Sequence, residues 1–190
     1  MNGRIVTLVA AAVIALAAPL TLDAQTLYIA GGATFPTSDF GNYAKTGWMA
    51  AGGVVFNDIG TAGLGLGVEG FYGENKHKSE DVDPEFNFGD SKTNPYGIMG
   101  IAVYNFDTGG SIQPYVFGGA GWMAHKYTAD PAFADEDETG SGFGYQFGAG
   151  VGFDLSESIE LFGEGRYMGG SGDVSDTKFF GLFAGLAFGL

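Results

Sequence analysis

The chain has 190 residues, enough for one domain, and it contains no cysteine, which excludes disulfides and thiolate metal sites. Its formal net charge of −14 argues against nucleic acid as a partner, because nucleic-acid recognition needs a basic surface. The 35 glycines alternate with apolar residues inside strand-length windows, and this regularity argues against a disordered low-complexity chain.

The first 24 residues predict a secretory signal peptide. Arg4 precedes a long apolar run, and Leu22-Asp23-Ala24 forms a cleavage site before Gln25. A retained membrane helix is the alternative, and a strand pattern that begins directly after the cleavage site disfavours it. Residues 25–190 would then form the mature domain. Beyond the signal, no apolar run approaches the ~20 residues that a membrane-spanning helix needs.

Eight windows of the mature chain predict β-strands, because apolar residues alternate in them with small or polar residues at a period of two. No window has the periodicity of an amphipathic helix. The predicted strands are 26–35, 47–57, 62–75, 94–106, 112–127, 142–154, 158–168 and 178–190.

The last predicted strand has one bulky apolar face, while its other face is mostly glycine and small residues. The bulky face consists of Phe180, Leu182, Ala184, Leu186, Phe188 and Leu190. The window 142–154 is similar, with aromatic and aliphatic residues opposite four glycines, Gln146 and Asp154. We expect the bulky faces to meet lipid and the small faces to meet a crowded lumen. The windows 94–106 and 112–127 are apolar on both faces, so their orientation stays open.

The connections between the predicted strands are alternately short and long. Short connections occur near residues 58–60, 107–111 and 155–157, and the other four are longer. This order predicts an all-β fold, an eight-stranded antiparallel up-and-down transmembrane β-barrel with all long loops at one end. Both termini would lie at the other, periplasmic end.

The long loops carry most of the acidic residues, and two of these loops hold ten of them. They are Glu80, Asp81, Asp83, Glu85 and Asp90 in one loop, and Asp130, Asp135, Glu136, Asp137 and Glu138 in the other. We interpret them as a solvated surface, with divalent cations that bridge to outer-leaflet phosphates as the alternative. Asp81 begins a stretch like a calcium loop, but Phe86 stands where the turn needs glycine and Lys92 where a bidentate glutamate belongs. No metal site is therefore predicted.

Four segments resemble a known family, the small eight-stranded outer-membrane β-barrels of the OmpA/OmpX and opacity-protein type. They are Gly31–Pro36 with Asp39-Phe40-Gly41, Pro114–Gly121, Leu161–Tyr167 and the closing strand. The resemblance implies the outer membrane of a Gram-negative-type envelope, with outer-membrane lipid and lipopolysaccharide as partners and no cofactor. It also implies that the barrel-assembly machinery reads the C-terminal strand. Family members usually end on Phe or Tyr, whereas this chain ends on Leu190.

The inward faces of two predicted strands supply a polar cluster for the lumen, namely Glu69, Glu160, Glu164 and Arg166. The interior of an eight-stranded barrel is filled by side chains, and buried carboxylates without a cation are costly. Because the guanidinium offers five donors, we expect Arg166 to lie between carboxylates and to close the lumen. A path for ions or small solutes through the same residues is the alternative.

Catalysis is not expected. The chain has only two histidines, His77 and His125, and neither belongs to a recognisable catalytic motif. Gly65–Gly70 matches the dinucleotide fingerprint by letter, but it lies within a predicted strand and opens no helix. We therefore expect a structural or surface-interaction protein. A narrow channel for small or apolar solutes and a soluble ligand-binding barrel of lipocalin type are the alternatives.

Overall fold

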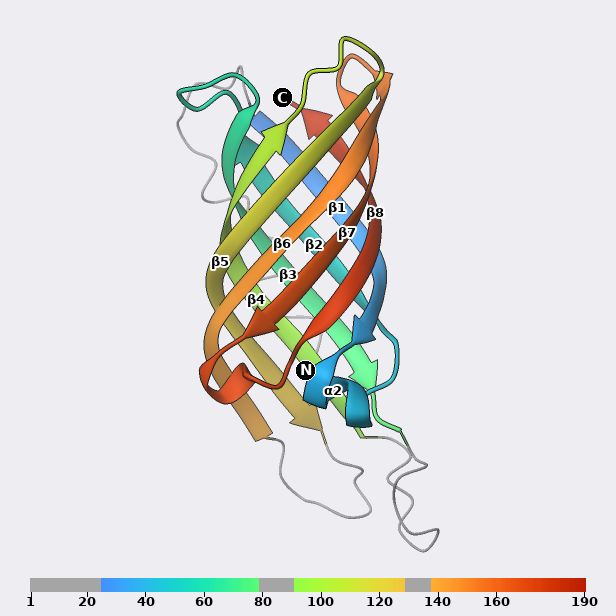
Figure 1. Ribbon diagram of the computed structural model, residues 1–190, viewed down its shortest axis with the longest axis vertical. Helices are drawn as coiled ribbons and strands as arrows, with labels where there is room; N and C mark the ends of the chain where they lie inside the picture. The colour runs from blue at the N-terminus through green and yellow to red at the C-terminus, as the bar shows by residue number, and fades with distance from the viewer. Residues whose placement is uncertain (1–24, 79–90, 129–137) are drawn as a thin grey trace, which may run out of the picture.

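Eight antiparallel strands close into a barrel in the computed structural model, which describes residues 25–78, 91–128 and 138–190 (Figure 1). Each strand pairs with its neighbours in chain order, and β1 pairs with β8 to complete the ring. The strands are β1 (Gln25–Pro36), β2 (Gly47–Phe56), β3 (Leu64–Lys76), β4 (Lys92–Asn105), β5 (Ile112–Thr128), β6 (Glu138–Ser156), β7 (Ile159–Gly170) and β8 (Phe179–Gly189). The predicted fold class is confirmed, and no predicted strand boundary differs from the observed one by more than four residues.

The two ends of the barrel differ in their connections. The short connections and the two ends of the strand array lie at one end, here called the turn end, where the Leu190 N–H donates to the Gln25 carbonyl at 2.9 Å. Two turns there are held by aspartates: Asp58 Oδ1 accepts from the Gly63 N–H and Asp107 Oδ1 from the Gly109 N–H, each at 2.8 Å. The long connections leave the opposite end, here called the loop end.

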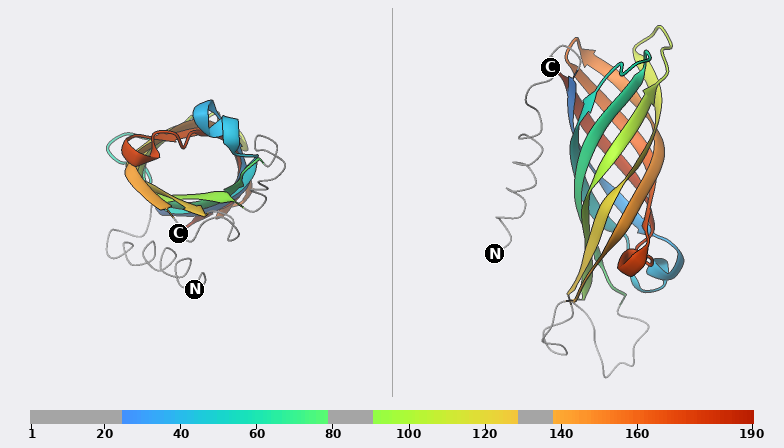
Figure 2. Two further views of the ribbon diagram at one scale, coloured as in Figure 1. Left: turned by 90° about the horizontal axis from the view of Figure 1, so that it is seen from below. Right: turned by 90° about the vertical axis from the view of Figure 1, so that its left-hand side faces the viewer.

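Two short helical elements lie at the loop end, α2 (Ser38–Tyr43) and the 3-10 helix η2 (Gly172–Val174) (Figure 2). Phe40 of α2 and Val174 of η2 are fully buried. The sequence pattern predicts neither element, because six residues and three residues are too few to display a helical period. Among the described residues, no helix has the length and hydropathy needed to cross a bilayer.

The outer surface of the barrel is apolar. Phe143, Phe147 and Leu182 are exposed at 56%, 57% and 53%. A water-soluble protein rarely exposes so much continuous apolar surface, whereas hydrocarbon would solvate it. Outward aromatic rings near the loop end contact one another across strands, and the pairs include Trp48 with Tyr72, Tyr96 with Trp122, and Tyr145 with Tyr167. They form an aromatic girdle of the kind found at a membrane interface.

The orientation that the sequence leaves open for β4 and β5 is settled by burial. Met99 and Met123 point inward and are at most 1% exposed, while Ile98 and Trp122 point outward and are 40% and 48% exposed. Both faces of these two strands are apolar because one face belongs to the outer surface of the barrel and the other packs inside the lumen.

The inner face of β6 is a nearly smooth wall. Between residues 144 and 152 its only inward side chain beyond glycine is Gln146. A Cβ at Gly144 would lie 2.7 Å from both Met99 and Met123, and a Cβ at Gly150 would lie 2.4 Å from the Tyr115 ring. Glycine on this wall therefore leaves room for large side chains that reach in from other strands.

Candidate functional site

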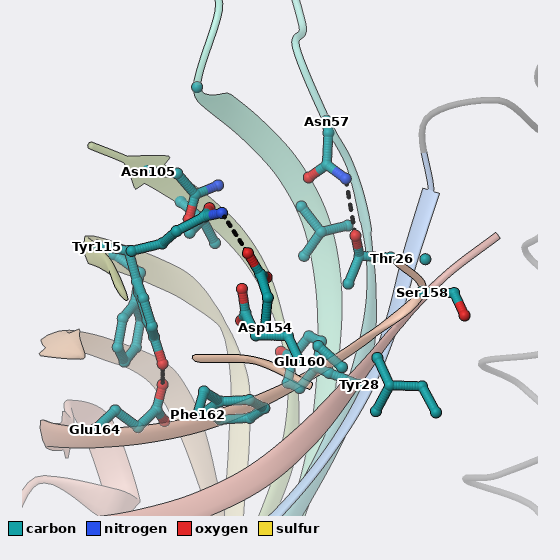
Figure 3. A pocket seen from close by; sticks show the side chains of 18 of the residues that line it. Thr26, Tyr28, Asn57, Asn105, Tyr115, Asp154, Ser158, Glu160, Phe162 and Glu164 are labelled. Atoms are coloured by element: carbon teal, nitrogen blue, oxygen red, sulfur yellow. Dashed lines mark hydrogen bonds between the residues drawn. The ribbon is translucent and has the colours of Figure 1, made fainter. Parts of the chain in front are cut away.

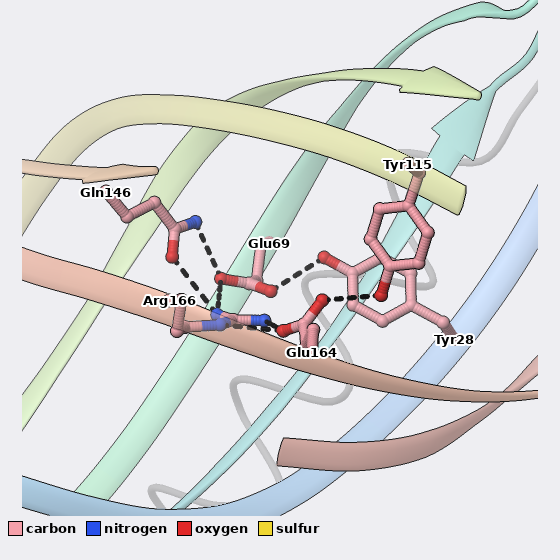
Figure 4. Close-up of polar contacts among 6 residues, drawn as sticks. All are labelled: Tyr28, Glu69, Tyr115, Gln146, Glu164 and Arg166. Atoms are coloured by element: carbon pink, nitrogen blue, oxygen red, sulfur yellow. Dashed lines mark hydrogen bonds and ion pairs between the residues drawn. The ribbon is translucent and has the colours of Figure 1, made fainter. Parts of the chain in front are cut away.

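Six polar side chains from five strands meet inside the barrel (Figure 4). They are Tyr28 of β1, Glu69 of β3, Tyr115 of β5, Gln146 of β6, and Glu164 and Arg166 of β7, and together they are called the Arg166 network. All are buried except Tyr115, which is partly buried. Alternation along each strand points these side chains inward.

The guanidinium of Arg166 lies between two carboxylates. Nη1 donates to Glu69 Oε1 at 2.8 Å and to Gln146 Oε1 at 3.1 Å, while Nε donates to Glu164 Oε1 at 2.8 Å. Nη2 also bonds Glu164 Oε1. The arginine side chain is only 2% exposed. A buried cation of this kind is stable only because carboxylates and hydrogen bonds compensate for lost hydration.

The remaining oxygens of both carboxylates are satisfied as well. The Tyr28 hydroxyl donates to Glu69 Oε2, and the Tyr115 hydroxyl donates to Glu164 Oε2, each at 2.8 Å. The Gln146 Nε2 donates to Glu69 Oε1 at 2.8 Å. Each carboxylate thus meets the guanidinium with one oxygen and a tyrosine with the other, which fixes the network in one geometry.

Aromatic rings enclose the guanidinium. Its Cζ lies 4.5 Å from the centroid of the Phe183 ring and 5.2 Å from that of Phe117. Both distances allow a cation–π attraction, and both rings displace water from the charged group.

The loop side of the network is packed with apolar side chains, and buried polar residues such as Thr34, Asn75 and Thr177 lie nearer the loop end. Four methionines here are at most 1% exposed and are called the methionine layer, namely Met49, Met99, Met123 and Met168. Phe179 and the buried Phe40 and Val174 belong to the same cluster. Unbranched methionine side chains fill irregular gaps well, so this half of the lumen is packed.

The turn side of the network is open. A cavity of about 490 Å³ lies here, called the turn-end cavity (Figure 3). Its inner wall includes Tyr28, Tyr115 and Phe162, and its mouth includes residues of the short turns such as Asp107 and Ser158. The lumen therefore has a filled half and an open half, with the Arg166 network between them.

Three of the four predicted lumen residues come together in the structure. Glu69, Glu164 and Arg166 form the centre of the network, whereas Glu160 lies nearer the turn end and lines the cavity without joining the network. Sequence reasoning did not single out five other residues of the site: Tyr28, Tyr115, Phe117, Gln146 and Phe183. Gln146 carried a usable signal, since it is the one polar residue between glycines on the inner face of β6.

The two histidines lie apart from the Arg166 network, near the loop end. His77 Nε2 lies 2.8 Å from Thr93 Oγ1, and His125 Nδ1 lies 2.7 Å from Thr177 Oγ1. His77 follows the last residue of β3, and burial lowers the pKa of its imidazole. His125 points into the barrel and therefore does not belong to the outward aromatic girdle. Of the ten acidic loop residues named above, only Glu138 lies within the described residues, and it is exposed.

Comparison with known proteins gives one family match and several similar structures. The model of the outer membrane protein beta-barrel domain matches residues 7–188. Neisserial surface protein A superposes with a TM-score of 0.58 at 18% identity, over 87% of this chain and 96% of that one. OprG from Pseudomonas aeruginosa also gives a TM-score of 0.58, at 13% identity, over 87% of this chain and 95% of that one. No curated protein matches the chain.

Proposed function

This chain belongs to the outer membrane protein β-barrel domain family, and from that premise we propose that it is an integral outer-membrane protein with a non-conducting lumen. Its role would be structural or surface-interacting, with any recognition carried by the segments at the loop end. The short turns would face the periplasm and the long connections would face the outside, as in other outer-membrane barrels.

The observation that carries this proposal is the double closure of the lumen. A solute that moved along the barrel axis would have to displace the buried guanidinium of Arg166 from two carboxylates. It would then meet the methionine layer, whose four side chains are at most 1% exposed. Breaking a buried ion pair costs about 3–5 kcal/mol, so spontaneous opening would be rare.

A narrow channel is the second candidate, and the turn-end cavity favours it. The cavity carries an open path from the turn end as far as the Arg166 network. A channel would need both the network and the methionine layer to move aside together. We therefore rank the channel below the closed barrel.

Conductance in planar bilayers tests the closure. We expect the wild-type protein to give no steady single-channel steps at neutral pH. A variant with E69A, E164A and R166A removes the network without leaving an unpaired charge, and adding M99A and M123A should then produce steady conductance. Gly163→Ala on the outward face, where a Cβ finds only ordinary contact, is the matched control. Steady steps from the wild-type protein would overturn the closed-lumen proposal.

Lipopolysaccharide is the lipid partner that the outer surface near the loop end fits best. On three neighbouring strands, an outward aromatic residue is followed four residues nearer the loop end by a lysine, giving the pairs Tyr72 and Lys76, Tyr96 and Lys92, and Trp122 and Lys126. Lys76 and Lys92 are register partners, and Lys92 also pairs with Glu74 at 2.8 Å. A row of lysines just beyond an aromatic girdle lies where anionic headgroups would be.

Thermal unfolding with added lipopolysaccharide tests that partner. Binding to the folded barrel should raise its unfolding temperature, and a variant with K76Q, K92Q and K126Q should lose most of that rise. Lys45, which lies in the connection before β2, provides the control substitution K45Q. An equal rise in both variants would remove the lysine row from the proposal. The alternative is that divalent cations bridge the acidic loops to lipid phosphates. Nearly all of those acidic residues lie outside the described part of the chain.

We also propose that residues 1–24 are a signal peptide and that the barrel-assembly machinery reads β8. N-terminal sequencing of the protein from outer-membrane fractions should begin at Gln25. Replacing Phe188 by Ser should reduce the amount of folded protein in that fraction, and Thr108→Ser in an exposed turn should not. An N-terminus at residue 1 would contradict the first part.

A further inference from the structure

We propose that the turn-end cavity is a binding site for small amphipathic amines, organic cations with a short apolar or aromatic body. The entry side, the periplasm, rests on the membrane orientation given under the proposed function. Nothing in that function requires a ligand, so the site would be an additional activity of the barrel. Four features of the cavity support it.

The first feature is its size and closure. A volume of about 490 Å³ lies within the range of about 300–1,000 Å³ that is typical of small-molecule sites. The Arg166 network closes the inner end of the cavity, and the other end opens between the short turns (Figure 3). A ligand would therefore enter and leave by the same mouth.

The second feature is an aromatic floor. The Phe162 ring meets the rings of Tyr28 and Tyr115 edge to face, at centroid separations of 6.2 Å and 6.4 Å. The two tyrosine hydroxyls are held by carboxylates of the network, so these rings are fixed before any ligand arrives. Val55 and Ile101 complete an apolar surface that would accept the body of the ligand.

The third feature is the sign of the charge. Five carboxylates line the cavity outside the network, those of Asp58, Asp107, Asp154, Glu157 and Glu160. Arg166 is the only cation among the lining residues, and its guanidinium is already engaged by Glu69 and Glu164. The described lysines all lie near the loop end. A cavity of one sign attracts the opposite charge and repels its own, so an anionic ligand is disfavoured.

The fourth feature is a pair of opposed carboxylates at the edge of the aromatic floor. Asp154 and Glu160 are register partners on β6 and β7, and like charges directly opposite each other destabilise a sheet. Asp154 Oδ2 accepts one hydrogen bond, from Gln113 Nε2 at 3.3 Å, while no hydrogen bond to the half-buried Glu160 carboxylate occurs among the described residues. An ammonium group placed between them would satisfy both.

The position of Glu160 is set by the smooth wall of β6. A Cβ at Gly152 would lie 2.4 Å from the Glu160 Cδ, so glycine at this position gives the carboxylate its space. Glu160 and Phe162 are both inward residues of β7, separated by one outward residue. The charged and the aromatic recognition elements are therefore neighbours, which favours a ligand that carries both an amine and an apolar body over a bare metal ion.

Isothermal titration of the complete mature protein in zwitterionic micelles tests the proposal, with phenethylamine as the probe. Phenylacetate has a similar body and the opposite charge, and Mg²⁺ has the charge and no body. We expect phenethylamine to bind and phenylacetate not to bind. Glu160→Gln should weaken phenethylamine by about tenfold, which corresponds to the loss of one charge-assisted hydrogen bond. Phe162→Leu should weaken phenethylamine more than it weakens methylamine.

The variants are chosen so that folding does not confound the result. Glu160→Gln removes a repulsion rather than a partner, and its unfolding midpoint in the absence of ligand should be unchanged or higher. Glu74→Gln, at the loop end, is the control that should leave binding unchanged. Equal binding of phenethylamine to wild type and Glu160→Gln would overturn the proposal, as would equal binding of phenylacetate. Mg²⁺ binding that depends on Glu160 while phenethylamine does not bind would overturn it in favour of a bare cation site.

A protein partner would appear differently in the same experiment. A lysine-rich peptide that bound with loss on Glu160→Gln, while phenethylamine did not bind, would replace the small amine by a polypeptide and overturn the ligand assignment. Binding in micelles does not depend on whether the barrel conducts. A failure of this site therefore leaves the conductance result intact, and the reverse also holds.

Discussion

The two halves of the lumen share one barrel wall and differ in what fills them. On the loop side of the Arg166 network, the methionine layer and Phe179 pack the interior, and each of these side chains is at most 1% exposed. On the turn side, a cavity of about 490 Å³ stays open. Exposed apolar side chains lie on the outside of both halves, such as Trp122 on the loop side and Val116 on the turn side. The lipid-facing pattern is thus independent of the contents of the lumen, which follow from the size and charge of the inward residues.

The largest effect is expected from removing the Arg166 network, which separates the two halves of the lumen. Arg166→Met leaves Glu69 and Glu164 buried without their cation, and we expect a loss of about 3–5 kcal/mol in the free energy of unfolding. Denaturant titration in micelles measures it. Adding E69Q and E164Q to this variant should recover much of the loss, because no buried charge then remains. If Arg166→Met were as stable as the wild-type protein, the Arg166 network would not stabilise the boundary between the two halves of the lumen.

Truncating one residue in each half should give unequal costs. Met123→Ala opens a void in a packed region, and we expect about 3 kcal/mol of destabilisation. Val103→Ala, at the wall of the turn-end cavity, removes a partly exposed side chain beside existing space, and about 1 kcal/mol is expected. Both changes in the free energy of unfolding are measured from the denaturant midpoints, provided that the dependence of that free energy on denaturant concentration is the same in each variant. Similar costs for the two variants would contradict the distinction between a filled half and an open half.

Adding one methyl group to the barrel wall should cost more on its inner face than on its outer face. Gly144→Ala would bring a Cβ to 2.7 Å from Met99 and Met123, and we expect a cost of about 2 kcal/mol from overpacking. Gly100→Ala faces outward, where the nearest atom is 3.8 Å away, and its stability should change by less than about 0.5 kcal/mol. Thermal gel mobility of the two variants, measured side by side, checks the difference.

The smallest expected effect is a pH dependence at the loop end. The His77 ring lies between the rings of Tyr43 and Tyr127, at 5.1 Å and 5.2 Å, and burial lowers its pKa below the ordinary value of 6.5. The unfolded chain therefore binds a proton at higher pH than the folded one, so stability falls as the pH drops below about 6.5 towards the folded pKa. Unfolding midpoints at pH 7.5 and pH 5 measure this loss.

The matched variant for the pH effect is His77→Phe, which keeps a ring between the two tyrosines and cannot be protonated. It should lose less stability than wild type over the same pH interval. The acidic residues titrate in both proteins, so the difference between them isolates the imidazole. Identical losses would assign the pH dependence to other groups.

Much of the fold follows from the sequence because alternation is a property of each strand alone. The same alternation assigns Glu69, Glu164 and Arg166 to the inward faces of β3 and β7. It does not assign Tyr115, because β5 is apolar on both faces, and it does not reveal which strands approach one another across the lumen. Tyr28 joins Glu69 over a separation of 41 residues, and this contact depends on the register and tilt of the whole ring.

The helix α2 shows a second limit of sequence reasoning. Its six residues include Gly41, and their one buried side chain, Phe40, gives no period to detect. The helix forms at the loop end because Phe40 can bury itself in the cluster of the methionine layer. Tertiary contacts, rather than local propensity, determine this element.

The barrel is closed by the pairing of β1 with β8, which runs from Thr26 opposite Gly189 to Pro36 opposite Phe179. This closure determines how the barrel unfolds. A closed sheet has no edge strand at which unfolding can start. Separating any two neighbouring strands inside a bilayer leaves two rows of backbone amides unpaired in hydrocarbon. Each unsatisfied group costs several kcal/mol. Amide hydrogen exchange in all eight strands should therefore converge on one shared opening free energy, irrespective of where in the ring an amide resides.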